Sequence, residues 1–515
     1  MTHTLHTLKQ PARPWLASLK LAALLIAIAV CLAANPLAAD DEAEEMAEEA
    51  AEEAAEESAE EAAEEAAEES AEEAAEESAE EAAEEAAEES AEEAAEESAE
   101  EVAESELEEG EEDGDFEQER EEDRDEFVKE SGTSGGEANS RTAFFEEFGE
   151  RDLVVRQELL VMADTGQIDT LIGRAELSLV SRISLKRLSG ELARFRVAQS
   201  YSPQQLSQRL KQQLPDASID LNHGYQIAGS ADQDPENPRL AGGVYQVPKE
   251  ARSKSIRIGM IDTNVDTEHA AFSSSRITER DFLSGSQQRD LKHGTGVASL
   301  LVGRTETFQG IAPGNQLLVA SVFADYSDQG LVATSHDLIA AMDWLVDQQA
   351  NPINISLSGP FNQVVSAAVE SLAKEGILLV AAVGNQGPFA KPRYPAAYAN
   401  VIGVTAVDRN GRLYSQAGRG DQVDYSGPGV GMQVARAGSG TEFDSVSGTS
   451  YATPLITGLM LAYQQQYDVT SEEGEALQAL IRKDMVDLGQ PGRDQLFGHG
   501  LPGRTWIDKT LGLSE

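Results

Sequence analysis

Cysteine is almost absent from this sequence. Only Cys31 occurs among the 515 residues, so the chain cannot form a disulfide bond within itself. The seven histidines are scattered along the chain, and a structural zinc site needs several Cys or His ligands at short, regular spacing. We therefore expect no bound metal ion and no other cofactor.

Basic residues are also scarce. The chain has 39 Lys and Arg against 93 Asp and Glu, a formal net charge of −54 at pH 7. Such a chain repels the phosphates of nucleic acids, which excludes nucleic-acid binding as a function class. Most of the excess acid lies in residues 40–130. The remainder has an ordinary globular composition and is long enough to bury a sizeable core.

The N-terminal residues have the pattern of an export signal. A few basic residues precede the apolar stretch LAALLIAIAVCLAA, and small residues follow up to Ala39. The stretch is shorter than the about 20 residues of a membrane-spanning helix. We therefore predict a signal peptide over residues 1–39, export to the periplasm or the outside, and only transient membrane contact. A lipid anchor on Cys31 is the alternative, although Val30 fits that processing poorly.

An acidic repeat follows the signal. Residues 47–98 consist of AEEA and AEES tetrads. Ala and Glu favour helix, but a period of four drifts by about 40° per repeat on a helix with 3.6 residues per turn, so no fixed apolar stripe forms. Each Glu also faces a Glu four residues on, which destabilises an isolated helix. We predict a low-complexity acidic helix or coil and charged linker over residues 40–130, acting as a spacer. Binding of divalent cations or of a basic surface is the alternative.

A small α+β domain is predicted over residues 145–228. LVVRQELLVMA has the composition of a strand, and RFRVAQSYSPQQLSQRLKQQLPDASIDLN reads strand–helix–strand. Ser202 with Gln205 forms a capping box, and Pro203 falls at the first helical position. By itself this domain could equally be an independent binding or dimerisation module.

Four polar residues occur at the ends of predicted strands and helices further along the chain. Asp262 ends the strand in SKSIRIGMIDTNVD, and His293 begins the helix in KHGTGVASLLVG. Asn385 follows the buried strand in GILLVAAVGNQG, and Ser450 begins the apolar helix in GTSYATPLITGLMLAY. Each residue alone is an ordinary turn, loop or cap residue. In an open α/β sheet, however, reactive groups collect beyond the carboxyl ends of the strands.

Together the four residue types are the parts of an acyl-transfer site. The serine attacks a carbonyl carbon, the histidine takes its proton, and the aspartate holds the histidine in the required tautomer. The oxyanion that forms needs hydrogen-bond donors, which a helix-start amide and an Asn side chain can supply. Asp262, His293, Ser450 and Asn385 are therefore the candidate catalytic residues. For Tyr451, the bulky neighbour of the serine, the sequence offers no physical account.

The same segments carry a family resemblance. Asp262-Thr263, His293-Gly294-Thr295, AAVGN and GTSYATP resemble the four signature blocks of the subtilisin-like serine endopeptidases. The chain order Asp, His, Ser is also the order of that family. The resemblance covers roughly residues 250–466. It implies an α/β fold over residues 245–515, with a mostly parallel sheet flanked by helices.

The resemblance further implies a zymogen. Residues 145–228 resemble the family's inhibitory propeptide, which assists folding. Its C-terminal stretch, here LPDASIDLNHGYQIAG, would lie in the active-site cleft until it is cut. We expect the chain to cut itself between about Gly229 and Pro248.

Substrate-binding residues are implied as well. NISLSG resembles the edge strand that pairs with an extended substrate backbone. The resemblance implies two pocket walls, formed by Ser356, Leu357, Ser358 and Gly359 and by Ala382, Val383 and Gly384. Arg393 would favour acidic substrate side chains if it pointed into this pocket. A solvent-facing loop charge is the alternative.

Some positions depart from the family pattern. Gly296 replaces the histidine that often follows HGT, and Asn264 replaces a common glycine. GRTETFQG lacks the calcium-binding loop of many relatives. The resemblance therefore implies no calcium site here.

The sequence thus predicts an exported serine endopeptidase, a monomer that acts on polypeptide substrates and on its own propeptide. Two alternatives remain open. One is a catalytically inactive relative that binds peptides in the same cleft, against which the complete set of four residues argues. The other is an interaction protein that acts through the acidic repeat.

Overall fold

A computed structural model describes most of the chain after residue 143. The described residues are 144–148, 152–228, 244–252, 255–283, 290–326, 329–469 and 474–508, and they belong to one compact unit, Gly135–Glu515. The predicted signal peptide, the acidic repeat and most of the expected self-cleavage range lie outside them.

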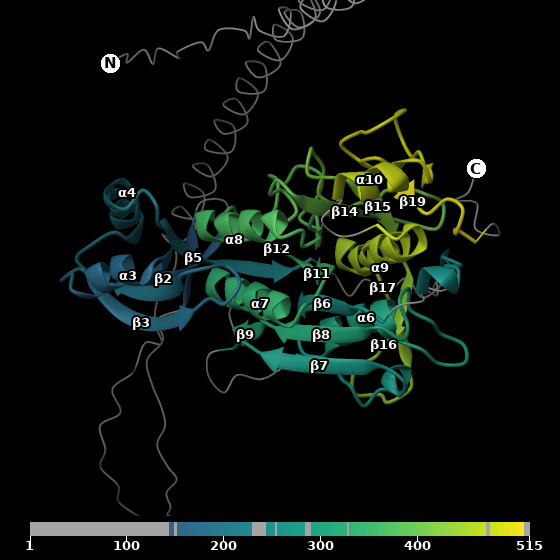
Figure 1. Ribbon diagram of the computed structural model, residues 1–515, viewed down its shortest axis with the longest axis horizontal. Helices are drawn as coiled ribbons and strands as arrows, with labels where there is room; N and C mark the ends of the chain where they lie inside the picture. The colour runs from purple at the N-terminus through teal and green to yellow at the C-terminus, as the bar shows by residue number, and fades with distance from the viewer. Residues whose placement is uncertain are drawn as a thin grey trace, which may run out of the picture. The chain divides into compact units, whose positions relative to one another are not determined.

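The larger part of this unit is built on a seven-stranded sheet in the order β15-β14-β13-β11-β6-β8-β7 (Figure 1). All of its strand pairs are parallel. The central strands are apolar and buried on both faces, as a covered parallel sheet requires. In chain order the strands are β6 (Arg257–Asp262), β7 (Arg276–Asp281), β8 (Gln316–Ser321), β11 (Ile353–Ile355), β13 (Leu379–Ala382), β14 (Val401–Val407) and β15 (Tyr425–Pro428).

Helices cover both faces of the sheet. One core contains Ile258 and Met260 of β6 together with side chains of α6, α9 and α10. The opposite core contains Ile261 of β6 with side chains of α7 and α8. Successive strand residues point to opposite faces, so β6 serves both cores. These layers confirm the predicted α/β fold with a parallel sheet flanked by helices. The helices are α6 (Lys292–Val302), α7 (Ser335–Asp347), α8 (Gln363–Lys374), α9 (Thr449–Tyr467) and α10 (Gly474–Arg482).

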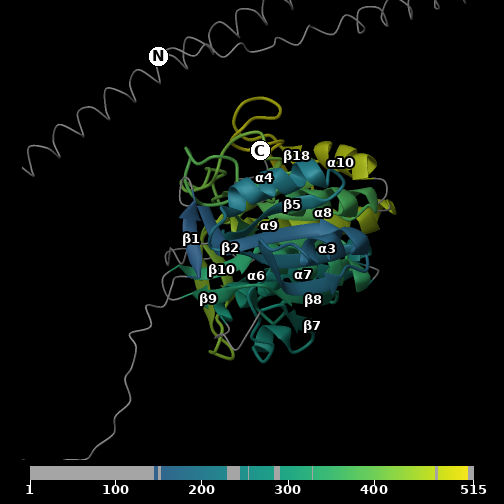
Figure 2. The same cartoon turned by 90° about the vertical axis from the view of Figure 1, so that its left-hand side faces the viewer.

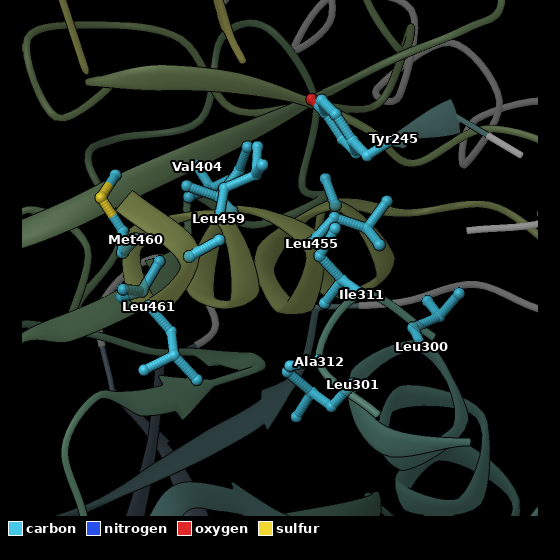
Figure 3. Close-up of a cluster of buried hydrophobic side chains, with 14 of the residues drawn as sticks. Tyr245, Leu300, Leu301, Ile311, Ala312, Val404, Leu455, Leu459, Met460 and Leu461 are labelled. Atoms are coloured by element: carbon cyan, nitrogen blue, oxygen red, sulfur yellow. The ribbon is translucent and has the colours of Figure 1, made fainter. Parts of the chain in front are cut away.

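Helix α9 runs through the first core (Figure 3). Leu455 and Leu459 of this helix are fully buried, as are Leu300 and Leu301 of α6. The whole apolar run from Leu455 to Tyr463 is buried, as the sequence predicted. Because residues 449–463 of α9 are all buried, the helix holds its first turn in a fixed place.

The smaller part is an α+β domain, seen from its own side in Figure 2. Its strands pair in the order β3-β4-β2-β5, and Leu206 and Leu210 of α4 are buried against them. Ser202 Oγ caps α4 by accepting from the Gln205 N–H at 3.4 Å, which confirms the predicted helix start. The elements are β1 (Phe145–Phe148), β2 (Asp152–Ala163), α3 (Thr165–Ile172), β3 (Leu177–Ser184), β4 (Glu191–Val197), α4 (Pro203–Gln213) and β5 (Ser218–Ile227).

Strand β5 links the two parts. Its first half pairs with β2 inside the small domain. Its second half is antiparallel to β10 (Gly330–Thr334) and to β12 (Leu357–Ser358) of the larger part. Short elements complete the described structure: η1 (Glu250–Arg252), η2 (Ala270–Phe272), β9 (Ala324–Tyr326), β16 (Met432–Ala435), β17 (Phe443–Val446), β18 (Met485–Val486) and β19 (Leu501–Pro502). Within the described ranges, no helix has the length and apolar character to span a bilayer.

Candidate active site

Asp262 and His293 meet beyond the carboxyl end of β6. His293 Nδ1 lies 2.7 Å from Asp262 Oδ1, and both residues are buried. The same carboxylate oxygen accepts from the Thr263 N–H at 2.7 Å. A buried carboxylate facing Nδ1 keeps the proton on that nitrogen, which leaves Nε2 able to accept one. In the described part of the chain, His293 Nε2 is buried without a hydrogen-bond partner.

Thr263 determines how closely the start of α6 lies to the end of β6. Its Oγ1 accepts from the Gly294 N–H at 2.8 Å. A Cβ on Gly294 would lie 2.5 Å from the Thr263 carbonyl oxygen, so only glycine allows the helix start this close to the strand end. The threonine after Asp262 and the glycine after His293 thus hold the two polar side chains together.

Ser450 lies fully buried in the first turn of α9. Gly448 caps this helix with a φ of 152°, a backbone region that favours glycine. The amides of a first helical turn have no partner within the helix, and the Ser450 N–H donates to the Ala228 carbonyl oxygen at 3.0 Å. The Ser450 hydroxyl donates to the Ser356 carbonyl oxygen at 3.2 Å.

Pro454 also shapes this first turn. It lies inside α9 and has no N–H to donate to the carbonyl of Ser450, four residues earlier. The Ser450 carbonyl oxygen instead accepts from Ser356 Oγ at 3.1 Å. Pro454 therefore leaves the Ser450 carbonyl free to accept this bond, which connects α9 to the residue before β12 (Leu357–Ser358).

Asn385 points its amide at the same carbonyl as Ser450 does. Its Nδ2 donates to Ala228 O at 2.6 Å. Thr449 determines this orientation, because its N–H and its Oγ1 both donate to Asn385 Oδ1, at 3.1 and 2.9 Å. The Ala228 oxygen therefore accepts two short hydrogen bonds, with Thr449 Oγ1 further away at 3.5 Å. Two such donors are the arrangement that stabilises the oxyanion of acyl transfer. The sequence did not identify Thr449 as the residue that orients Asn385.

The two expected pocket walls lie next to each other. Ser358 Oγ accepts from Gln386 Nε2 at 3.0 Å, and a Cβ on Gly384 would lie 3.1 Å from Ser358 Oγ. The remaining wall residues of the prediction, Ser356, Leu357, Ala382 and Val383, are fully buried. Gln386 was missed because its position next to Gly in a turn gives no signal for a pocket residue.

Gly359 makes room for a large side chain of β5. Tyr225 is fully buried, and a Cβ on Gly359 would lie 2.4 Å from Tyr225 Cδ1. The tyrosine hydroxyl donates to the Pro360 carbonyl oxygen at 3.2 Å. Burial raises the pKa of Tyr225, so it remains a neutral donor at this place.

Arg393 fits neither of its two sequence-based interpretations. Its Nη1 lies 2.8 Å from Asp152 Oδ1 at the start of β2, and its side chain is only 18% exposed. The Arg393 guanidinium thus forms an ion pair that joins the larger part to the small domain. A second set of such contacts joins Lys186 to Asp347 and Arg187 to Glu375.

Among the residues that the structure describes, no group of three or more acidic, His or Cys side chains could hold a metal ion. The arrangement at Ala228 instead combines an Asp–His pair, a serine and two oxyanion donors. These are groups that can perform acyl transfer without a metal.

Comparison with known proteins leads to one family. Residues 253–500 match the family model described as the subtilase family. The chain is 32% identical over 251 residues to the minor extracellular protease Epr of Bacillus subtilis, covering 48% of this chain and 38% of that protein. It is 35% identical over 255 residues to halolysin of Haloferax mediterranei, covering 48% of each. The chain thus spans less than half the length of either curated relative.

A solved structure agrees in fold. Fervidolysin from Fervidobacterium pennivorans, a keratinolytic enzyme related to subtilisin, has a TM-score of 0.58 and 19% identity, covering 72% of this chain and 63% of that chain. At this identity the likeness concerns the fold alone. It supports a subtilisin-like fold for the described part of the chain.

Proposed function

We propose that the chain is the precursor of an exported serine endopeptidase that first cuts itself between Ala228 and Gly229. The observation that carries the proposal is the Ala228 carbonyl oxygen, which accepts from the Ser450 N–H at 3.0 Å and from Asn385 Nδ2 at 2.6 Å. A substrate carbonyl held by two such donors is in the position from which an oxyanion would form. This bond lies directly before the range expected from the sequence.

The chemical steps follow from the positions of the groups. The Ser450 hydroxyl leaves the Ser356 carbonyl and donates to His293 Nε2, which has no other described partner. Ser450 Oγ then attacks the Ala228 carbonyl carbon while Nε2 takes the hydroxyl proton, and Asp262 stabilises the imidazolium. Collapse of the oxyanion breaks the C–N bond, and Nε2 gives the proton to the leaving amine of Gly229. Water then gives a proton to Nε2 and attacks the carbonyl carbon of the acyl-enzyme. Collapse of this second oxyanion breaks the ester bond, and Nε2 returns the proton to Ser450 Oγ.

Other polypeptides would bind as β5 does. The backbone of β5 is antiparallel to β12, with Leu357 opposite Ile227, and the Ala228 N–H reaches the Ser356 carbonyl at 3.5 Å. Main-chain pairing of this kind accepts many sequences and leaves selectivity to the pockets between alternate side chains. The substrate class is therefore extended polypeptide, with the side chain before the cut between the walls at Ser358 and Gly384.

Residues 145–228 act as the inhibitory propeptide in this proposal, and residues 245–515 form the catalytic domain. After the cut, β5 would still fill the cleft. The pairs of Arg393 with Asp152, and of Lys186 with Asp347, add contacts that hold the domain in place. Residues 1–39 would direct export to the periplasm or the outside, and residues 40–130 would be a spacer.

The proposal is tested by comparing the wild type with Ser450→Ala. We expect the wild type to convert to a shorter form whose first residue is Gly229, to hydrolyse casein and to react with a fluorophosphonate. Ser450→Ala should do none of these. Ser415, an exposed loop residue, provides the matched control, because Ser415→Ala should behave as the wild type. A wild type that neither processes itself, nor cuts casein, nor is labelled would leave the inactive peptide-binding protein as the correct interpretation.

A further inference from the structure

Tyr451 forms a side wall for His293. The two rings have centroids 5.3 Å apart, at an interplanar angle of 46°. Tyr451 is only 6% exposed. It directly follows Ser450 in α9, so the residue that would supply the nucleophile and the residue that contacts the imidazole are joined by one peptide bond.

The space for this ring comes from Gly296. This glycine lies three residues after His293 in α6, and therefore on the same side of the helix. A Cβ at Gly296 would lie 3.4 Å from Tyr451 Cε1 and 3.2 Å from Val434 Cγ2. The contact with Tyr451 would be an ordinary one for an alanine, and the contact with the buried Val434 would be tight. A side chain that extends beyond Cβ at 296 would therefore push on the Tyr451 ring. The small Gly296 on α6 and the large Tyr451 on α9 are thus complementary in size.

The imidazole needs such a wall. The bond from Nδ1 to Asp262 fixes one atom of the ring, while Nε2 has no described partner. One hydrogen bond leaves the ring free to tilt about that contact, and a shift of about 1 Å in a reacting group can cost a factor of about 100 in rate. A packed aromatic ring on the side of the imidazole limits that tilt.

We propose that Tyr451 is a positioning residue that holds His293 Nε2 toward Ser450, and that Gly296 provides the space it requires. The proposal rests on the proposed function. It attributes the positioning of His293 to the aromatic ring of Tyr451 and not to its hydroxyl, because the contact with His293 is between the two rings. It also implies that positions 296 and 451 are energetically coupled through one contact.

The kinetic test uses Tyr451→Phe, Tyr451→Leu, Gly296→Val and the double variant Gly296→Val/Tyr451→Leu. We expect Tyr451→Leu to lower kcat about 10- to 100-fold with KM within about twofold. Tyr451→Phe should keep wild-type kcat, since it keeps the ring. Gly296→Val should lower kcat in the otherwise wild-type chain but cause no further loss in the Tyr451→Leu background, where the smaller side chain leaves room. Additive losses, a change confined to KM, or an unchanged kcat in Tyr451→Leu would overturn the proposal.

A second readout does not need hydrolysis. In the uncut Ser450→Ala precursor, the Nδ1–H of His293 bonded to Asp262 should give a slowly exchanging, far-downfield proton resonance. We expect this resonance to persist when Tyr451→Phe is added and to be lost or strongly broadened with Tyr451→Leu. An unchanged resonance in Tyr451→Leu would overturn the positioning role. Failure of the proposed function would appear separately, as a wild type without activity or fluorophosphonate labelling.

Discussion

Single residues control this site mainly through how closely they let other groups approach. Gly294 allows α6 to begin against the Thr263 carbonyl, and Gly359 allows the Tyr225 ring to lie against its backbone. In both places a Cβ would fall closer than 3.0 Å to another atom. Neither glycine has a positive φ. Glycine is therefore required at these positions by a neighbouring residue, which leaves no room for a Cβ, and not by the backbone conformation.

Gly359→Ala should slow self-cleavage strongly. The added Cβ would lie 2.4 Å from Tyr225 Cδ1, so β5 could not keep both its pairing with β12 and the position of Tyr225, three residues before Ala228. Adding Tyr225→Ala to Gly359→Ala should restore cutting, since the clash disappears. The time course of precursor loss on a gel measures the effect.

The control for this prediction is Gly474→Ala, where a Cβ meets nothing within 4 Å and the rate should not change. Wild-type cutting by Gly359→Ala would contradict the expected clash. So would a Gly359→Ala/Tyr225→Ala variant that stays as slow as Gly359→Ala alone.

At the scale of elements, strand β5 and helix α8 meet through a buried polar contact. Asn362 caps α8, and its Oδ1 accepts from the N–H groups of Val364 and Val365. Its Nδ2 must therefore face the other way, where it lies 2.8 Å from His223 Nδ1 on β5. A donor facing Nδ1 requires that this nitrogen accept, so the docked His223 is neutral.

The surroundings of His223 oppose its protonation overall. Burial lowers the pKa of His223, against the attraction of Asp220 and Asp152, while Lys211 of α4 acts in the same direction as burial. Arg393 is paired with Asp152. On the α7 side, His336 Nδ1 lies 2.9 Å from Asp337. The docked small domain thus holds its histidine below the ordinary pKa of about 6.5.

Acid should therefore loosen the cut small domain. A freed His223 binds a proton below about pH 6.5, whereas the docked one does so only at lower pH, so docking is strongest above that value and weakens as the pH falls through it. We expect the cut complex to gain activity faster at about pH 5.5 than at about pH 7.5, because the inhibiting strand leaves. His223→Gln should flatten this dependence. Release that is independent of pH in the wild type, or equally steep in His223→Gln, would contradict the prediction.

At the scale of the whole molecule, the excess negative charge and the candidate site lie in different parts of the sequence. The acidic repeat and its charged linker, residues 40–130, precede the compact unit Gly135–Glu515 that contains the candidate site. The tetrads of residues 47–98 offer no fixed apolar face to pack on another surface. We therefore expect the repeat to supply only negative charge and a spacer of a certain length.

Deletion of residues 47–98 should leave turnover unchanged. No residue of the candidate site lies in that range, and a segment without an apolar face adds nothing to the core. The measurement compares kcat and the yield of processed enzyme for the full chain and the deletion. A large fall in folding yield would instead show that the acidic segment assists maturation.

The sequence by itself determined the local features of this protein. The strand ending at Asp262, the helix beginning at His293 and the Ser202 cap all follow from apolar patterns and end signals within a few residues, because such patterns decide which short segments can be buried. The apolar run after Ser450 likewise predicted the buried helix α9. Four candidate residues at element ends could thus be selected without coordinates.

Only the tertiary structure decided which other residues contact these candidate residues. Asn385 and Ala228 are 157 residues apart, Arg393 and Asp152 are 241 apart, and Tyr451 contacts His293 from another helix. Nothing in the local sequence encodes such contacts, because they depend on how whole elements pack and on the register in which β5 enters between β10 and β12. A shift of one residue in that register would turn the alternate side chains of β5 to the opposite faces and move the Ala228 carbonyl away from Ser450 and Asn385.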